Sequence, residues 1–148
     1  MLIEFRASRE PVGGGHGIGI RNRLYFSPSD YGYRIRVIYG LDGVWSYVME
    51  RIVLSAATTM VSGSTGVVAA PNVSYSLRLR TTGASPTTVR ARFWRTDTYE
   101  PSTWLVDTTD STAGLQTAGT FNIRARAESG FAGDPMLYSV DRVLGLQL

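Results

Sequence analysis

Arginine recurs at every second position in four short stretches of the sequence, and such pairs could bind an anionic or polyhydroxyl ligand. The pairs are Arg34 with Arg36, Arg78 with Arg80, Arg90 with Arg92, and Arg124 with Arg126. Side chains two residues apart on a β-strand point to the same face and lie about 6.6 Å apart. If some of these strands are neighbours, their arginines form a ladder with an electropositive face. Because a guanidinium group suits flat anionic groups, a cell-wall glycan is one candidate ligand.

We predict that the ligand-binding arginines are Arg36, Arg80 and Arg92. Trp45 and Tyr47 are predicted to join them by stacking on sugar rings, since aromatic rings present a flat apolar face. These five residues form the glycan site that the sequence suggests.

A second interpretation of the same residues remains open. Charged side chains on strands most often cover the outer face of a sheet. The arginine stems then lie along that face while the guanidinium groups pair with Glu4, Glu50 or Asp107. In the same way, Trp45 and Tyr47 would pack in the core or at its rim, where aromatic residues are common in sandwiches.

Patterns for catalysis or metal binding are weak. A glycosidase needs two carboxylates flanking the scissile bond, and the acidic residues are scattered along the chain instead. Asp107 and Asp110 could bind Ca²⁺ through oxygen, but short acids more often cap turns, and Glu100 is expected to be buried or capping. There is no cysteine, and His16 is the single histidine, which excludes Cys-based and His-cluster metal sites. We therefore predict no enzyme activity, no metal and no cofactor.

The composition indicates one globular domain spanning residues 1–148, with a packed core, because 43% of the residues are hydrophobic. All 15 basic residues are arginine, and the formal net charge is +3. This mild excess comes without a nucleic-acid-binding motif, so we predict no nucleic-acid partner. No apolar run is long enough to cross a bilayer, so we predict no membrane insertion.

Alternation of apolar and polar residues predicts about ten short strands and negligible helix. The expected strands are Leu2–Arg9, His16–Leu24, Tyr33–Tyr39, Trp45–Leu54, short pieces near Val61 and Val67–Val68, Tyr75–Thr82, Thr88–Arg95, Trp104–Thr109, Thr112–Leu115, Phe121–Ala127 and Leu137–Leu144. Many short strands with polar turns are typical of an all-β antiparallel sandwich of the jelly-roll kind.

One segment also resembles a known family. The hairpin "LRLRTTGASPTTVRARFW", followed by "EPSTW" and "DSTAGL", is similar to the C-terminal half of concanavalin-like, laminin-G-like β-sandwich modules. Such modules occur in secreted actinobacterial polysaccharide-degrading proteins and in tail or structural proteins of phages that infect those bacteria. The matching positions are Gly83, Pro86, Trp94, Glu100, Pro101, Trp104, Asp110, Ser111, Thr112, Ala113 and Leu115. The resemblance is specific from Leu77 to Leu115 and looser over Phe5–Leu144.

The resemblance implies a concanavalin-like fold and a non-catalytic role, structural or adhesive, with host-surface glycan as a possible ligand. Modules of this family usually carry further N-terminal strands, which this chain lacks. We therefore expect other virion proteins, or symmetry copies of the chain, to cover an exposed sheet edge.

The setting that we expect is a bacteriophage virion, in a tail, fibre, baseplate or capsid decoration. The first residues, MLIEFRASRE, lack the pattern of a signal peptide, which favours a virion protein over a secreted one. The alternative is a carbohydrate-binding module of a secreted bacterial polysaccharide-degrading enzyme, which would be extracellular.

Overall fold

Ten strands and no helix make up the regular structure of the computed structural model, which describes residues 1–26, 29–133 and 135–145. The strands are β1 (Leu2–Ala7), β2 (His16–Phe26), β3 (Asp30–Tyr39), β4 (Val44–Val53), β5 (Ala56–Val68), β6 (Tyr75–Thr82), β7 (Thr87–Arg95), β8 (Val106–Asp110), β9 (Thr120–Ala127) and β10 (Tyr138–Leu144). Within these ranges, the chain holds no helix that could cross a membrane.

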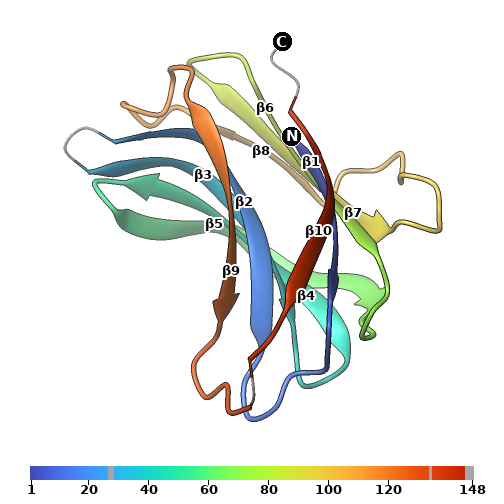
Figure 1. The fold of residues 1–148 in the computed structure, drawn as a ribbon. Helices are drawn as coiled ribbons and strands as arrows, with labels where there is room; N and C mark the ends of the chain where they lie inside the picture. The colour runs from blue at the N-terminus through green and yellow to red at the C-terminus, as the bar shows by residue number, and fades with distance from the viewer. Residues whose placement is uncertain (27–28, 134, 146–148) are drawn as a thin grey trace.

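The strands form two five-stranded sheets that pack face to face (Figure 1). The first sheet has the order β10-β1-β6-β7-β8, and the second has the order β5-β4-β3-β2-β9. Neighbouring strands in both sheets are antiparallel. The predicted all-β antiparallel sandwich is therefore confirmed. Strands β9 and β10 end their sheets on the same side of the sandwich (Figure 1).

Alternating side chains explain the core. On β6, Leu77 and Leu79 are fully buried, and on β3 the same holds for Ile35 and Val37. The residues between them point outward, as the period of two requires. The strands thus place apolar side chains between the sheets and arginine on the two outer faces.

Two expectations about the strands are wrong. Thr112–Leu115 forms no strand, because the chain turns there after β8. The region rich in Ser, Thr and Gly forms one long strand, β5, rather than short pieces. β5 lies at the edge of the second sheet and is mostly exposed, so it contributes few of the buried apolar residues from which strands are recognised in a sequence.

Candidate functional site

The four arginine pairs lie on the outer faces of both sheets. On the first sheet, Arg78 stands opposite Arg92 and Arg80 stands opposite Arg90, so the expected ladder exists on β6 and β7. The three arginines predicted to share a site are nevertheless separated. Arg80 and Arg92 belong to the first sheet, whereas Arg36 lies on β3 of the second sheet. Because both outer faces point away from the core, one ligand site cannot include all three.

Three of the four arginines in the ladder on the first sheet have a carboxylate partner, and two of them share one carboxylate. The Arg78 guanidinium donates to Glu100 Oε2 at 2.7 Å, and that of Arg92 donates to Glu100 Oε1 at 2.8 Å. The Arg92 guanidinium also lies 3.8 Å from the centroid of the Trp104 ring, in a cation–π contact. Glu100 therefore links β6 and β7 through their arginines. It was expected to be a buried or capping carboxylate, but it is only partly buried, and the hydrogen bonds that it accepts come from arginine side chains.

Two of the three acids expected to pair with these arginines do so. Glu50 pairs with Arg34 and Arg36, and Asp107 pairs with Arg90. Glu4 instead pairs with Arg142, which lies outside the four arginine pairs. The architectural interpretation of the arginines is thus confirmed for these pairs.

The outer face of the second sheet has a different arrangement, because β2 carries glycine between two arginine-bearing strands. Gly17 stands between Arg126 of β9 and Ile38 of β3, and Gly19 stands between Arg124 and Arg36. A Cβ atom on Gly19 would lie 2.5 Å from a backbone oxygen of β3 and 3.0 Å from the Arg36 Cγ atom. The missing side chains leave a shallow channel along β2, and the Arg36 stem lies over part of it.

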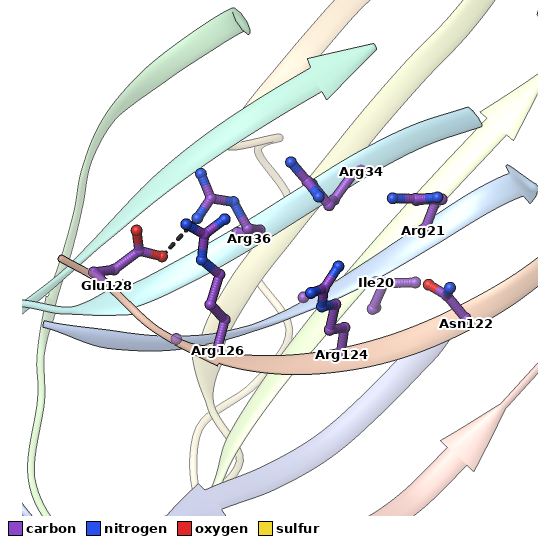
Figure 2. A pocket seen from close by; sticks show the side chains of 10 residues that line it. Ile20, Arg21, Arg34, Arg36, Asn122, Arg124, Arg126 and Glu128 are labelled. Carbon is purple, nitrogen blue, oxygen red and sulfur yellow. Dashed lines mark hydrogen bonds and ion pairs between the residues drawn. The ribbon is translucent and has the colours of Figure 1, made fainter. Parts of the chain in front are cut away.

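We call this channel the arginine trough. Its lining residues are Gly17, Gly19, Ile20, Arg21, Arg34, Arg36, Asn122, Arg124, Arg126 and Glu128. Figure 2 shows the five guanidinium groups gathered over the same stretch of β2, β3 and β9. The enclosed volume is only about 20 Å³, which is room for about one water molecule. A ligand must therefore lie along the rim of the trough, as an extended chain can.

Three of the five arginines in the trough have carboxylate partners. Arg34 and Arg36 both donate to Glu50 Oε2, at 2.8 and 3.3 Å, and Arg36 also donates to Glu128 Oε1 at 2.6 Å. The third, Arg21, is buried and donates to Asp30 at 2.8 Å. Burial alone would raise the pKa of Glu50, but the hydrogen bonds and charges of its two arginines outweigh burial and lower that pKa.

The other two arginines, Arg124 and Arg126, are exposed and have no ion pair or side-chain hydrogen bond within the described part of the chain. They share the outer face of β9, an edge strand. Five guanidinium groups against three carboxylates leave the trough with a positive surplus, located on β9. An anionic group placed here would gain two charge-assisted contacts without displacing an existing partner.

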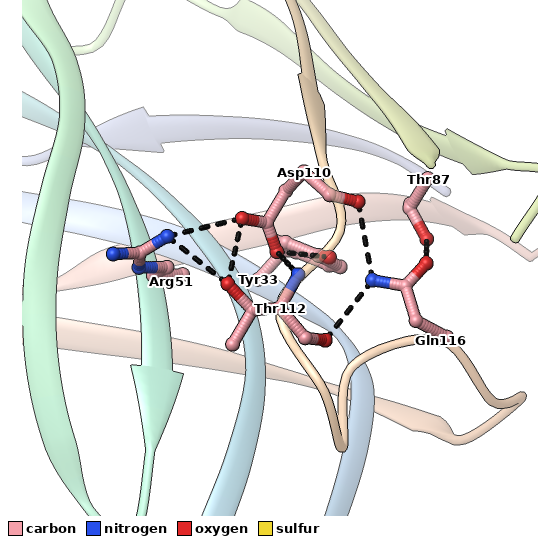
Figure 3. Close-up of polar contacts among 6 residues, drawn as sticks. All are labelled: Tyr33, Arg51, Thr87, Asp110, Thr112 and Gln116. Carbon is pink, nitrogen blue, oxygen red and sulfur yellow. Dashed lines mark hydrogen bonds and ion pairs between the residues drawn. The ribbon is translucent and has the colours of Figure 1, made fainter. Parts of the chain in front are cut away.

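A separate polar cluster surrounds Asp110 at the end of β8 (Figure 3). Its carboxylate accepts hydrogen bonds from the backbone N–H and hydroxyl of Thr112, from the Tyr33 hydroxyl and from Arg51. Gln116 then donates to the backbone oxygens of Asp110 and Thr112. Asp110 is thus a turn cap, as its sequence position suggests. Among the described residues, no group of three or more His, Cys, Asp or Glu could hold a metal ion.

Trp45 and Tyr47 do not lie at either arginine surface. Both side chains are buried, so the prediction that they stack on sugar rings is wrong. Trp45 is 0% exposed and its ring packs 5.8 Å from Phe5 and 5.2 Å from Tyr75, measured between ring centroids. Tyr47 is 8% exposed and belongs to the same core. Both follow the core interpretation, because the face of β4 that carries them points between the sheets.

Two features of the site were missed by the prediction. Arg124 and Arg126 were recognised as a pair but not as site residues. The nearest acid in the sequence, Glu128, follows Arg126 by two residues and pairs with Arg36 instead. The alternation of Gly17 and Gly19 with Ile18 already puts glycine on an outer face. The strand order that makes those glycines the floor of a trough could not be known from the sequence.

Comparisons with models of protein families, with curated proteins and with solved structures find no match to this chain. The function is therefore inferred from the geometry of the molecule and from the resemblance of its hairpin segment.

Proposed function

We propose that the chain is a non-catalytic structural or adhesive β-sandwich protein of a bacteriophage virion, and that its arginine trough binds an acidic glycan of the host surface. The single observation that carries the glycan proposal is the pair of exposed arginines, Arg124 and Arg126, without a partner in the described structure. The virion setting and the concanavalin-like classification come from the resemblance of Leu77–Leu115 to modules of phage tail and structural proteins.

The shape of the trough favours a polymer over a small molecule. It is too shallow to enclose a ligand, but it runs along the glycine-bearing part of β2 with cationic groups on both sides. Arginines two apart on a strand repeat at about 6.6 Å, a spacing of the order of a sugar unit, so successive acidic groups can meet successive arginines. Arginine also matches carboxylate and sulfate with paired donors.

Carboxylates at the trough support a binding role rather than a hydrolytic one. Glu50 and Glu128 are each held by arginine, and both receive hydrogen bonds from Arg36. A glycosidase needs one carboxyl group that stays protonated to donate to the leaving group. The lowered pKa of Glu50 keeps that group ionised instead.

Symmetry copies of the chain are the proposed structural partner, and the side formed by β9 and β10 is the proposed contact. Val140 and Val143 stand opposite the core residues Phe5 and Ile3, so they point inward, yet they remain 39% and 43% exposed. Phe121 of β9 is 47% exposed on the same side. Apolar side chains that are aimed at the core but still reach solvent are typical of a surface that another chain covers.

The glycan proposal is tested by titrating the protein with polygalacturonate at low ionic strength, using amylose as the neutral polymer. We expect binding to polygalacturonate alone, weakened by salt because exposed charges are screened. The double variant Arg124→Ala and Arg126→Ala should lose at least about tenfold in affinity, since charge-assisted contacts contribute about 1.5–3 kcal/mol each.

The matched control removes two exposed arginines from the other sheet. Arg6→Ala with Arg95→Ala lowers the net charge by the same amount and leaves the trough intact. If the two double variants bound polygalacturonate equally, net charge alone would explain the binding and the proposed site would be wrong.

A further inference from the structure

A second hollow lies at the end of the sandwich where β1 begins, away from the trough. One wall is formed by residues 78–82 of β6 and by Gly83 just after it, and the other by Asn22 and Arg23 of β2 together with Ala118 and Gly119. The volume is about 790 Å³. Ligand sites in proteins commonly have volumes of about 300–1,000 Å³. The hollow is therefore large enough for a ligand of several rings, whereas the trough is not.

The pocket lies beside the part of β6 that is not paired with β1. The backbone of Met1 pairs with that of Leu79, and the pairing of the two strands stops there. β6 continues to Thr82, and among the described residues no strand pairs with this last part of it on the side of the pocket. A free edge offers backbone donors and acceptors, in addition to side chains, to whatever lies against it.

The opposite wall is held in place by a β-bulge in β2. Arg23 has a φ of 52°, which is unusual for a residue other than glycine, and the pairing of β2 shifts register around it. Its guanidinium group crosses to the first sheet and donates to Thr87 Oγ1 at 2.6 Å, to the Leu115 oxygen at 3.0 Å and to the Gly83 oxygen. Asn22 also reaches across, donating to Thr81 Oγ1 at 3.0 Å. The two walls are thus fixed before a ligand arrives.

The charges at the pocket are cationic. Three arginines line it, namely Arg23, Arg78 and Arg80, and none of its described lining residues is acidic. Arg23 and Arg78 already have acceptors, but Arg80 is exposed and has no ion pair or side-chain hydrogen bond within the described residues. Thr81, Thr82 and Asn22 add hydroxyl and amide groups. A strained residue beside a preorganised pocket with an unused cation is the kind of arrangement found at binding sites.

We propose that this pocket is a second binding site, which takes a short acidic saccharide with its carboxylate or sulfate on Arg80. The hydroxyl groups of the ligand meet Asn22, Thr82 and the free edge of β6. This site does not depend on the trough, because the two share no lining residue.

The test uses trigalacturonate as the probe and maltotriose as the neutral trisaccharide, with the Arg124→Ala, Arg126→Ala double variant as the background so that the trough does not contribute. We expect trigalacturonate to bind and to shift the amide NMR signals of residues 78–83 and of Ala118 and Gly119. Arg80→Ala should weaken binding by at least about tenfold, the effect of one lost charge-assisted contact. Ala118→Phe should weaken it similarly by filling the pocket, and it leaves every charge in place.

Arg90→Ala is the matched control. Arg90 stands opposite Arg80 on β7 but does not line the pocket, and its partner is Asp107. We expect the affinity of this variant to stay within about twofold of the background, because Arg90 does not line the pocket and its charge is balanced by Asp107. Wild-type affinity in both Arg80→Ala and Ala118→Phe, or signal shifts confined to other residues, would overturn the proposal. If the trough did not bind polygalacturonate, the expected binding of trigalacturonate at the pocket would be unchanged. The two experiments therefore show separately whether the trough or the pocket fails to bind.

Discussion

Glu50 shows how a single carboxylate organises the trough. It is 6% exposed, and it accepts from Arg34 and Arg36 on the neighbouring strand β3. An ion pair with this degree of burial is weakly screened, so removing the negative charge leaves two guanidinium groups facing each other. Glu50 therefore sets the positions of the two cations on the β3 side of the trough, opposite Arg124 and Arg126.

Glu50→Gln should destabilise the fold at neutral pH and much less in acid. Because the pKa of Glu50 is lowered in the folded state, its stabilising contribution is fully present above its ordinary value of 4.5. That contribution is lost as the pH falls through the lowered pKa, since the folded state must then take up a proton. We expect a loss of about 1–3 kcal/mol at pH near 7 in urea unfolding, and a difference that shrinks toward zero once Glu50 is protonated.

Glu10→Gln is the control, because Glu10 is exposed and outside the trough. The free energy of unfolding of this variant should match that of the wild type across the same pH range. If Glu50→Gln lost the same free energy of unfolding at acid pH as at neutral pH, the shape of the Glu50 side chain and not its charge would be stabilising.

Ion pairs were predictable where both partners lie on one face of adjacent strands. Glu50 and Arg36 belong to strands that the sequence places next to each other through a short turn. Asp107 and Arg90 also belong to strands that are consecutive in the chain, but residues 96–105 separate these strands, so their pairing is less directly indicated. Glu128 could not be assigned to Arg36 in this way, because 92 residues separate them and only the packing of β9 on β2 brings them together.

At the scale of the strands, the alternation of apolar and polar residues predicts where each strand lies. It does not predict which strands pair with one another. Tyr75–Thr82 was predicted with the bounds of β6, because its apolar and charged residues alternate strictly. Nothing local to β9 indicates that it pairs with β2, about a hundred residues earlier. The trough needs β2 to lie between β3 and β9, so its existence follows from long-range pairing and not from any segment alone.

The turn after β8 depends on Asp110, and Asp110→Ala should loosen it. Its carboxylate is 6% exposed and receives donors from Thr112, Tyr33 and Arg51, all of which would lose their acceptor. We expect a loss of about 2–4 kcal/mol in the free energy of unfolding, measured with urea. Faster amide exchange over residues 111–119 should accompany it, because that segment is tied to β8 through this cluster.

Asp107→Ala, three residues earlier on β8, is the comparison. Asp107 is 46% exposed in its side chain and pairs with Arg90 at the surface, so a loss below about 1 kcal/mol is expected. Equal losses in the two variants would contradict a capping role for Asp110. A gain in stability of the wild type on adding Ca²⁺ would instead support the metal-binding interpretation of these acids.

For the whole molecule, β9 connects the proposed binding and assembly surfaces. Its outward residues Arg124 and Arg126 belong to the trough, while Phe121 and Ile123 point inward at the open side of the sandwich. Copies joined along this side would bury the apolar residues and bring the troughs near one another. A single shallow trough offers few contacts, but several troughs on one particle can bind one polymer with much greater avidity.

Self-association through the β9–β10 side is the prediction that tests this arrangement. We expect native mass spectrometry and light scattering to show a closed oligomer, since apolar residues left exposed beside an unpaired edge favour symmetric contacts. Val140→Ser with Val143→Ser should raise the dissociation constant by at least about tenfold, because each valine loses burial of apolar area worth about 1 kcal/mol. Val68→Ser is the control for replacing an exposed valine elsewhere, since Val68 is 67% exposed on β5, an edge strand of the second sheet. A wild-type protein that stays a monodisperse monomer at high concentration would refute the assembly and leave the trough as the binding face of an autonomous module.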